Sequence, residues 1–332
     1  MLACILAFYP GEKFEDVCSA IAEEVSYLLI VDNSPDSILL RDEIWLPKNS
    51  SIIYNKNEGA VAGALNIALT LARERGFEYL QIFDQDTMLP AGITSALVDT
   101  LKFNPKAVLV SPRFINLNTN HPGRVMTYIS KWKIKNIWPN TDIGIVQALF
   151  TITSASLINL KLLPQDLYYD ERLIIDGCDV DFCLALRDKQ LQIIVNTSQC
   201  IIHGIGNRKN GGGRWSPTNY SPQRKFLGAK NRVIVWRRYL KKYPGFIIND
   251  CYVFFLDTVR TVLLEKDKIN KLKAIIMGVF AGAREKNILI RKHNNRIECI
   301  SDKTFEKEKT VILLKGDYVG KQSKAKRTHS DS

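Results

Sequence analysis

The sequence lacks a pattern of paired cysteines. Its seven cysteines are scattered, their number is odd, and no Cys-x-x-Cys pair occurs. A disulfide-stapled secreted domain is therefore not predicted, and this cysteine usage is typical of a reducing compartment such as the cytosol.

Long hydrophobic runs and leader segments are also lacking. The first apolar run, Met1–Phe8, has no basic region and is interrupted by Pro10, so we expect a strand rather than a signal peptide. Segment 274–283 is too short to cross a bilayer, and Cys251–Leu264 contains Asp257 and a second charged residue. No transmembrane helix is predicted.

Two common nucleotide-binding motifs do not occur. The Walker pattern Gly-x-x-x-x-Gly-Lys-Ser/Thr is absent, and no Gly-x-Gly-x-x-Gly follows the first expected strand. A P-loop nucleotidase and an NAD-binding enzyme therefore have little support from the sequence.

Negative charge is scarce in one long segment. The chain has a net charge of +12, and segment 204–249 contains eleven Lys and Arg residues but no Asp or Glu. Such a basic segment indicates an anionic partner, for which nucleic acid, anionic lipid and a diphosphate substrate are the candidates, or else a solvated basic face.

What the sequence does contain is an alternation of strands and helices. Its 332 residues are enough for one large α/β domain with an appendage. The expected strands are Leu2–Phe8, Tyr27–Val31, Ser51–Tyr54 and Tyr79–Phe83, and the expected helices are 12–24, 57–75 and 93–103. This alternation predicts a parallel, doubly wound sheet whose strands end along one edge, where such sheets bind ligands.

Acidic residues follow the fourth expected strand directly. Asp84 and Asp86 lie on a tight turn, close enough to share one divalent cation, and hard oxygen ligands suit Mg²⁺ or Mn²⁺. His203 lies at the end of a later expected strand and is a third candidate ligand, or a structural histidine. The alternative for the two acids is a solvated loop.

The second strand ends in Asp32-Asn33, whose carboxylate can accept hydrogen bonds from a ribose or a base. Asn57 and Gly59 open the next helix, and the glycine would allow a ligand to approach the helix N-terminus, which favours anions. These residues form a second group of candidate ligand-binding positions at the same edge.

Three acids, Asp176, Asp179 and Asp181, surround an expected helix start near Gly177. A carboxylate in the first turn that faces a cleft is a candidate general base, and Asp179 has that position. The alternative is that these acids only complement the helix dipole.

The later regions are expected to be less regular. Residues 112–142 read as an irregular connection suited to an acceptor-binding insertion, or as an ordinary packed excursion. Arg208 and Lys209 precede three glycines and could belong to a lid that closes over a diphosphate, or to a disordered loop. Basic helices with aromatic residues follow position 223 and suggest contact with anionic lipid, and the tail from Ser301 is expected to be partly disordered.

Taken in order, these motifs resemble those of the family-two glycosyltransferases with the GT-A fold, and within them the bacterial rhamnosyltransferases of O-antigen and capsule synthesis. The resemblance covers about residues 1–290. It rests on Tyr9-Pro10, Val31-Asp32-Asn33, Asn57-x-Gly59 with Asn66, Phe83-Asp84-Gln85-Asp86, Ile175-Asp176 with Asp179-Val180-Asp181, and His203 with Gly206. The chain departs from the family at Ala155, where Gly usually follows Ser, and at Ala185, where Arg is usual.

The resemblance implies a role for each of these positions. Asp32, Asn33, Asn57, Gly59 and Asn66 would contribute to binding the nucleotide, together with Asp84 and the cations Arg208 and Lys209. Asp86, Asp84 and His203 would hold Mg²⁺ or Mn²⁺. Asp179 would be the base, with Asp181 as the second candidate.

The resemblance further implies an inverting sugar transfer, with L-rhamnose from dTDP-L-rhamnose as the transferred sugar. The acceptor would be a saccharide, and it could be linked to a lipid. The reaction would take place at the inner face of a bacterial plasma membrane. Residues 1–222 would form the GT-A domain, 223–300 a basic helical region and 301–332 a Lys-rich tail. The alternatives are transfer from a UDP-hexose and a non-catalytic protein that binds nucleotides or nucleic acid, although no specific nucleic acid is expected.

Overall fold

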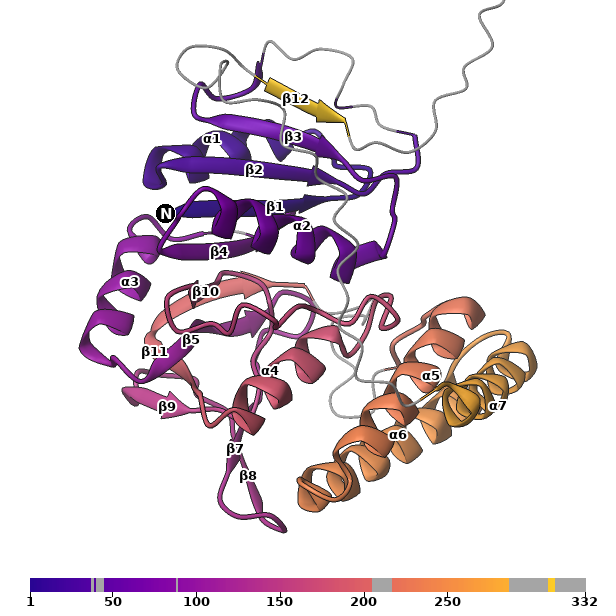
Figure 1. Cartoon of the computed structure of the whole chain (residues 1–332). Helices are drawn as coiled ribbons and strands as arrows, with labels where there is room; N and C mark the ends of the chain where they lie inside the picture. The colour runs from indigo at the N-terminus through magenta and orange to yellow at the C-terminus, as the bar shows by residue number, and fades with distance from the viewer. Residues whose placement is uncertain (37–38, 40–44, 88, 205–216, 287–309, 314–332) are drawn as a thin grey trace, which may run out of the picture.

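The structure is a computed structural model. It describes residues 1–36, 39, 45–87, 89–204, 217–286 and 310–313. Within these ranges the chain forms a large central sheet with helices on both faces, and a group of helices beside one end of it (Figure 1).

The sheet confirms the expected mostly parallel arrangement. Its strand order is β12-β3-β2-β1-β4-β10-β5-β11-β9. The strands are β1 (Leu2–Ala7), β2 (Tyr27–Asp32), β3 (Ser50–Tyr54), β4 (Tyr79–Asp84), β5 (Ala107–Asn116), β9 (Ile145–Gln147), β10 (Ser156–Asn159), β11 (Gln192–His203) and β12 (Thr310–Leu313). β1 pairs in parallel with β2 and β4, whereas β10 runs antiparallel between β4 and β5. The carboxyl ends of β1, β2 and β4 therefore meet at one edge.

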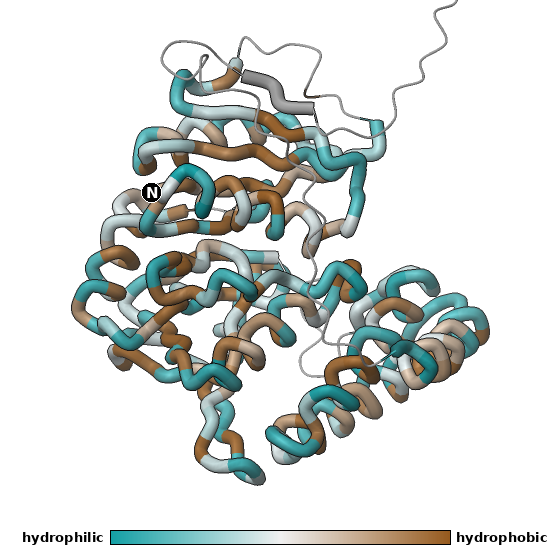
Figure 2. The backbone as a smooth tube through the Cα atoms, viewed as in Figure 1, coloured by the Kyte–Doolittle hydropathy of each residue, from teal (hydrophilic) through white to brown (hydrophobic). Residues whose placement is uncertain are grey.

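The sheet is buried on both faces, as the near-continuous apolar strands require. Along β1, Leu2 and Cys4 pack into one core cluster with α2 (Ala60–Glu74) and α4 (Cys178–Asp188). Ala3 and Ile5 alternate with them and pack on the other face, with α1 (Phe14–Glu24) and α3 (Ile93–Phe103). Figure 2 shows the hydrophobic residues concentrated along these central strands.

The C-terminal region consists of α5 (Pro222–Tyr239), α6 (Pro244–Leu264) and α7 (Lys268–Arg284). The backbones of α5 and α7 approach closely because Gly278 and Gly282 face α5, where any side chain would overlap carbonyl oxygens of that helix. The buried Glu265 carboxylate binds Lys271 at 2.8 Å and lies 3.5 Å from Lys225, so charge pairs join the three helices. Among the helices that the structure describes, none combines the length and the apolar character needed to cross a membrane.

Two local expectations were wrong. Residues 112–142 are not irregular, because β5 continues to Asn116 and is followed by β6 (His121–Pro122) and by a hairpin of β7 (Val125–Tyr128) and β8 (Ile134–Ile137). The two expected closing strands form one strand, β11, with a register shift between Asn196 and Cys200. In the tail, residues 310–313 form β12 in parallel with β3. The rest of that tail lies outside the described residues.

Candidate active site

The turn after β4 is held against the end of β1 by the middle residue of the Asp84-Gln85-Asp86 motif. The Gln85 side chain accepts a hydrogen bond from the Phe8 backbone N–H at 2.6 Å and donates one to the Phe8 carbonyl at 3.2 Å. This pair of bonds continues the β1–β4 pairing beyond its last register position, Leu6 with Asp84. The two acids on either side of Gln85 are thereby fixed at the ligand-binding edge of the sheet.

Asp84, Asp86 and His203 come together at this edge, as the sequence predicted. Each offers one ligand atom, and the three atoms lie within 4.8 Å of one another. His203 Nε2 is 3.8 Å from Asp84 Oδ2. Two carboxylates and one imidazole are donors that bind divalent cations, Mn²⁺ among them, so the residues present fit the implied metal.

Ser154 supports this cluster from the loop before β10. Its hydroxyl donates a hydrogen bond to the Asp84 carboxylate and lies 3.3 Å from His203 Nδ1. Burial raises the pKa of Asp84, while the Ser154 hydrogen bond opposes that rise. The next residue, Ala155, is buried with φ 56°, in the left-handed region that favours glycine. Ala155 therefore adopts a left-handed backbone conformation at the position where the resembled family usually has Gly.

A cavity of about 530 Å³ opens beside Asp84, and we refer to it as the donor cavity, after the substrate that we propose for it below. It lies at the ends of β1, β2 and β4 and is closed by the start of α2 and the start of α5. Its lining includes three predicted site residues, Asn33, Asn57 and Asp84. It also includes Gln85, Ser221, Gln223 and Arg224 among its polar residues.

Three other predicted nucleotide-binding residues do not line the donor cavity. Asp32 is fully buried and accepts a hydrogen bond from the Ser34 backbone N–H at 2.8 Å. Asn66 is fully buried inside α2, and its side chain bonds the Tyr169 backbone in both directions, at 2.8 and 3.0 Å. Gly59 caps α2 with φ 65°. In this structure the contacts of Asp32, Asn66 and Gly59 stabilise the backbone at this edge of the sheet.

The structure explains why position 59 is occupied by glycine, which the sequence alone does not. A Cβ atom there would lie 2.8 Å from Glu171 Oε2 and 2.9 Å from the Gly63 Cα, and the positive φ would also strain any side chain. The glycine is thus favoured by its own backbone conformation and by the tight first turn of α2, and the Glu171 side chain leaves little room beside it. Arg208 and Lys209, the predicted lid cations, lie outside the described residues.

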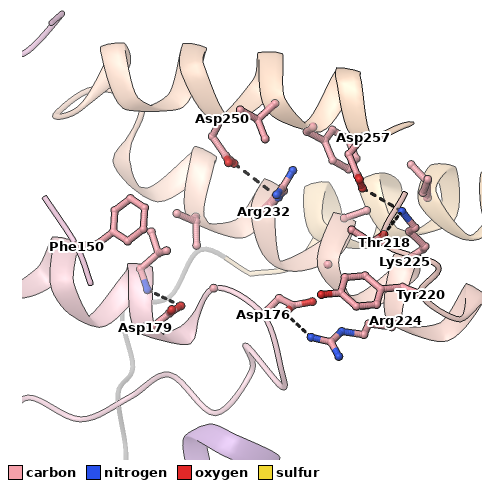
Figure 3. A pocket seen from close by; sticks show the side chains of 18 of the residues that line it. Phe150, Asp176, Asp179, Thr218, Tyr220, Arg224, Lys225, Arg232, Asp250 and Asp257 are labelled. Atoms are coloured by element: carbon pink, nitrogen blue, oxygen red, sulfur yellow. Dashed lines mark hydrogen bonds and ion pairs between the residues drawn. The ribbon is translucent and has the colours of Figure 1, made fainter. Parts of the chain in front are cut away.

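A second cavity, of about 410 Å³, lies between the start of α4 and helices α5 and α6 (Figure 3). We refer to it as the acceptor cavity, after the substrate that we propose for it below. Its lining contains acidic, basic and apolar side chains. The charged lining residues are Arg124, Asp176, Asp179, Arg224, Lys225, Arg232, Asp250, Asp257 and Arg260. Arg224 also lines the donor cavity, so the two cavities share this side chain.

Asp179 lies in the first turn of α4, two residues after the N-cap Gly177, whose φ of 92° lets the chain turn into the helix. It is half-buried, lines the acceptor cavity and accepts a hydrogen bond from the Val180 backbone N–H at 2.8 Å. Burial raises the pKa of Asp179 to about 6, and the negative charges of Asp176 and Asp84 add to this rise. A carboxylate with a pKa near neutrality in a cavity is suited to general base chemistry.

Asp181, the second candidate base, lies in a different environment. Its side chain is fully buried and pairs with Arg238 of α5, whose guanidinium also contacts Asp170 at 2.7 Å. The side chains of all three are at most 3% exposed. Asp181 lines neither cavity, so the two candidate bases lie in different environments.

No family model matches the sequence. The dTDP-rhamnosyl transferase RfbF of Shigella flexneri is 22% identical over 285 residues, which cover 85% of this chain and 95% of that protein.

Two solved structures share the fold. GalNAc-T7, crystallised with UDP, GalNAc and Mn²⁺, has a TM-score of 0.53 and 11% identity over 78% of this chain. The S. aureus TarS fragment 1–349 has a TM-score of 0.50 and 14% identity, covering 84% of this chain and 80% of the fragment. The chain spans about half the length of GalNAc-T7, 54%. These likenesses confirm the predicted fold class.

Proposed function

We propose that this chain, which has the GT-A glycosyltransferase fold, is an inverting glycosyltransferase that moves a sugar from a nucleoside diphosphate to a saccharide acceptor in the synthesis of a cell-surface polysaccharide. The observation that carries this proposal is the position of the Asp84, Asp86 and His203 cluster. It adjoins a cavity large enough for a nucleotide sugar, and the candidate base Asp179 lies in the neighbouring cavity.

The donor we propose is dTDP-L-rhamnose. Two observations support it: the Phe83-Asp84-Gln85-Asp86 order resembles that of the rhamnosyl branch, and the matched Shigella protein is named as a dTDP-rhamnosyl transferase. A UDP-hexose is the nearest alternative. A nucleotide-binding or nucleic-acid-binding protein without transfer chemistry is the more distant one.

In the proposed reaction, Asp179 takes the proton of an acceptor hydroxyl. The hydroxyl oxygen forms a bond to the anomeric carbon as the bond from that carbon to the diphosphate breaks, and the electron pair leaves with the diphosphate. One displacement of this kind inverts the anomeric configuration. The Val180 N–H, which donates to Asp179 Oδ1, fixes the direction of the carboxylate.

Asp84, Asp86 and His203 would hold Mg²⁺ or Mn²⁺. When bound, such an ion supplies Lewis-acid neutralisation of charge on a diphosphate. The described residues themselves orient the site: Gln85 fixes the turn, and Ser154 fixes the Asp84 carboxylate.

The acceptor we propose includes a lipid-linked saccharide, reached from the inner face of a bacterial plasma membrane. Support comes from large apolar side chains that are exposed on two C-terminal helices, and from the exposed lysines Lys268 and Lys273 of α7. The apolar side chains include Ile248, Tyr252, Phe255 and Leu263 on α6, and Ile269, Ile276, Met277 and Phe280 on α7. Apolar side chains with basic neighbours favour an anionic bilayer surface.

Membrane contact can be tested with exposed residues only. Phe255→Glu and Phe280→Glu, whose side chains are 63% and 59% exposed, should weaken sedimentation with vesicles containing phosphatidylglycerol. Phe103→Glu on α3, 85% exposed, is the matched control and should bind like the parent protein. Equal vesicle binding by all the variants would contradict membrane contact through this surface.

The function itself is tested first by thermal shift with dTDP, UDP, GDP and CDP, each with and without Mn²⁺. A ligand at about one hundred times its Kd adds about 2.7 kcal/mol, and each kcal/mol raises the midpoint by about 2–4 °C in a domain approaching this size. A Mn²⁺-dependent shift that is largest with dTDP is expected. A shift with UDP alone would discard rhamnose, and no shift with any nucleotide would contradict the transferase.

A further inference from the structure

Arg224 connects the two cavities. It lies at the third position of α5, after the N-cap Ser221, whose hydroxyl accepts a hydrogen bond from the Arg224 backbone N–H at 3.3 Å. Its side chain lines both the donor and the acceptor cavity. Among the described residues that line the donor cavity, it is the single cation, and Asp84 is the single acid.

The present partner of Arg224 lies on the acceptor side. A guanidinium nitrogen donates to Asp176 Oδ1 at 3.2 Å, and the guanidinium stacks on Tyr220 with 4.0 Å to the ring centroid (Figure 3). The two side chains of the ion pair are 37% and 41% exposed, so water screens the pair and makes it weak. The buried Arg224 Nε has no hydrogen-bond partner among the described residues. The Arg224 guanidinium therefore makes only a weak ion pair, and its Nε–H has no hydrogen-bond acceptor among the described residues.

A nucleoside diphosphate would bring a stronger partner into reach. Its diphosphate carries at least two negative charges, whereas Asp176 carries one. A planar guanidinium can bind two phosphate oxygens at once through parallel N–H groups. In the donor cavity, the described lining provides no other cation to take that position.

Building on the proposed function, we propose that Arg224 exchanges Asp176 for the diphosphate of the donor. The exchange frees the Asp176 carboxylate at the entrance of the acceptor cavity, three residues before Asp179, where it can accept a hydrogen bond from an acceptor hydroxyl. Filling the donor cavity therefore prepares the acceptor cavity, and the binding of the two substrates is coupled.

The exchange makes a prediction about binding that a purely structural Arg224 does not. Calorimetric titration with dTDP and Mn²⁺ should show that Arg224→Met raises the Kd by about 10- to 100-fold, since a charge-assisted hydrogen bond to phosphate is lost. Arg224→Lys should retain part of the affinity. Asp176→Asn, which frees the guanidinium in advance, should lower the Kd by about two- to fivefold.

The double variant decides the question. If Asp176 acts only by holding Arg224, Asp176→Asn should have no effect on the Kd in an Arg224→Met background. Lys242→Gln, which removes an exposed lysine paired with Asp188 away from both cavities, is the control for loss of one positive charge.

The outcomes separate this inference from the function on which it rests. Failure of the parent protein to bind any nucleoside diphosphate would contradict the transferase itself. Binding by the parent, with equal binding by Arg224→Met or with an Asp176→Asn effect that persists in the double variant, would overturn the exchange alone. Should Arg224→Met not fold, the same comparison in the Arg224→Lys background must show a reduced effect of Asp176→Asn.

Discussion

Replacing Asp179 and Asp181 separately by Asn should have opposite effects on stability, and only the Asp179 variant should lose most of its activity. The two acids are two residues apart in the sequence. Asp179 lines the acceptor cavity, whereas Asp181 is fully buried and pairs with Arg238 of α5. Asn keeps the size of the side chain and removes only the charge. The pair of variants therefore compares the same chemical change in two environments.

The magnitudes follow from those environments. Loss of the general base should lower kcat by about 10²–10⁴-fold in Asp179→Asn. The folded protein raises the pKa of Asp179 from 3.8 to about 6, so its charged form is disfavoured by about 3 kcal/mol above that pH. Asp179→Asn should therefore be more stable than the parent at pH 8, and the difference should shrink to about 0.5 kcal/mol near pH 4, where the carboxyl is protonated in the folded protein but still partly ionised in the unfolded chain.

Asp181→Asn should be destabilised instead. It removes one of two carboxylates around the buried Arg238, and breaking such a buried pair costs about 3–5 kcal/mol, with the lower end expected because Asp170 remains in contact. Its kcat should stay within about tenfold of the parent, since Asp179 is unchanged.

Both quantities can be measured on the same preparations, by urea unfolding at pH 8 and pH 4 and by release of dTDP from the donor. Transfer at a near-parental rate by Asp179→Asn would refute its role as base. A stable but inactive Asp181→Asn would transfer that role to Asp181 and contradict the separation that the structure shows.

Three further outcomes are expected. The kcat/KM of the parent should fall about tenfold per pH unit below about 6, as Asp179 is protonated, measured as initial rates in buffers of constant ionic strength. His203→Ala should weaken Mn²⁺ binding at least about tenfold in a calorimetric titration, whereas Asp99→Asn, an exposed acid on α3, should not. Gly278→Ala should lower the free energy of unfolding by about 1–3 kcal/mol because its methyl group would overlap an α5 carbonyl oxygen, while Gly11→Ala, with open space around it, should stay within about 0.5 kcal/mol.

The sequence was most informative where a strand pattern runs directly into a polar motif. The apolar β4 ends at Asp84, so the position of the acids at the sheet edge followed from the strand itself. His203 was found in the same way, at the end of β11. These signals are local in the chain, and the parallel topology then brings the strand ends together.

Contacts between distant segments were not predictable in this way. In the sequence Gln85 is only the middle residue of a motif, yet in the structure it bonds Phe8 at the end of β1, 77 residues away. Arg224 was one of eleven cations in a basic segment, and nothing in its local pattern indicates that two cavities meet at its side chain. The motif order predicts that Asn66 contributes to nucleotide binding, and the sequence gives no sign that its amide also bonds the backbone of Tyr169, 103 residues later. Such roles depend on which segments the fold places side by side.

The acids around α4 show how one short motif can provide different chemistry. Successive helical residues are about 100° apart, so Asp179 and Asp181 point to nearly opposite sides of α4. Asp181 therefore faces α5, where Arg238 stabilises its charge. Asp179 faces the cavity, where none of the described cations is bonded to it and burial raises its pKa. Asp176 precedes the helix and is free of that geometry, and it reaches Arg224 instead. Environment, rather than the Asp-x-x-Asp-x-Asp spacing, distinguishes the proposed base, the structural ion pair and the proposed exchangeable partner of Arg224.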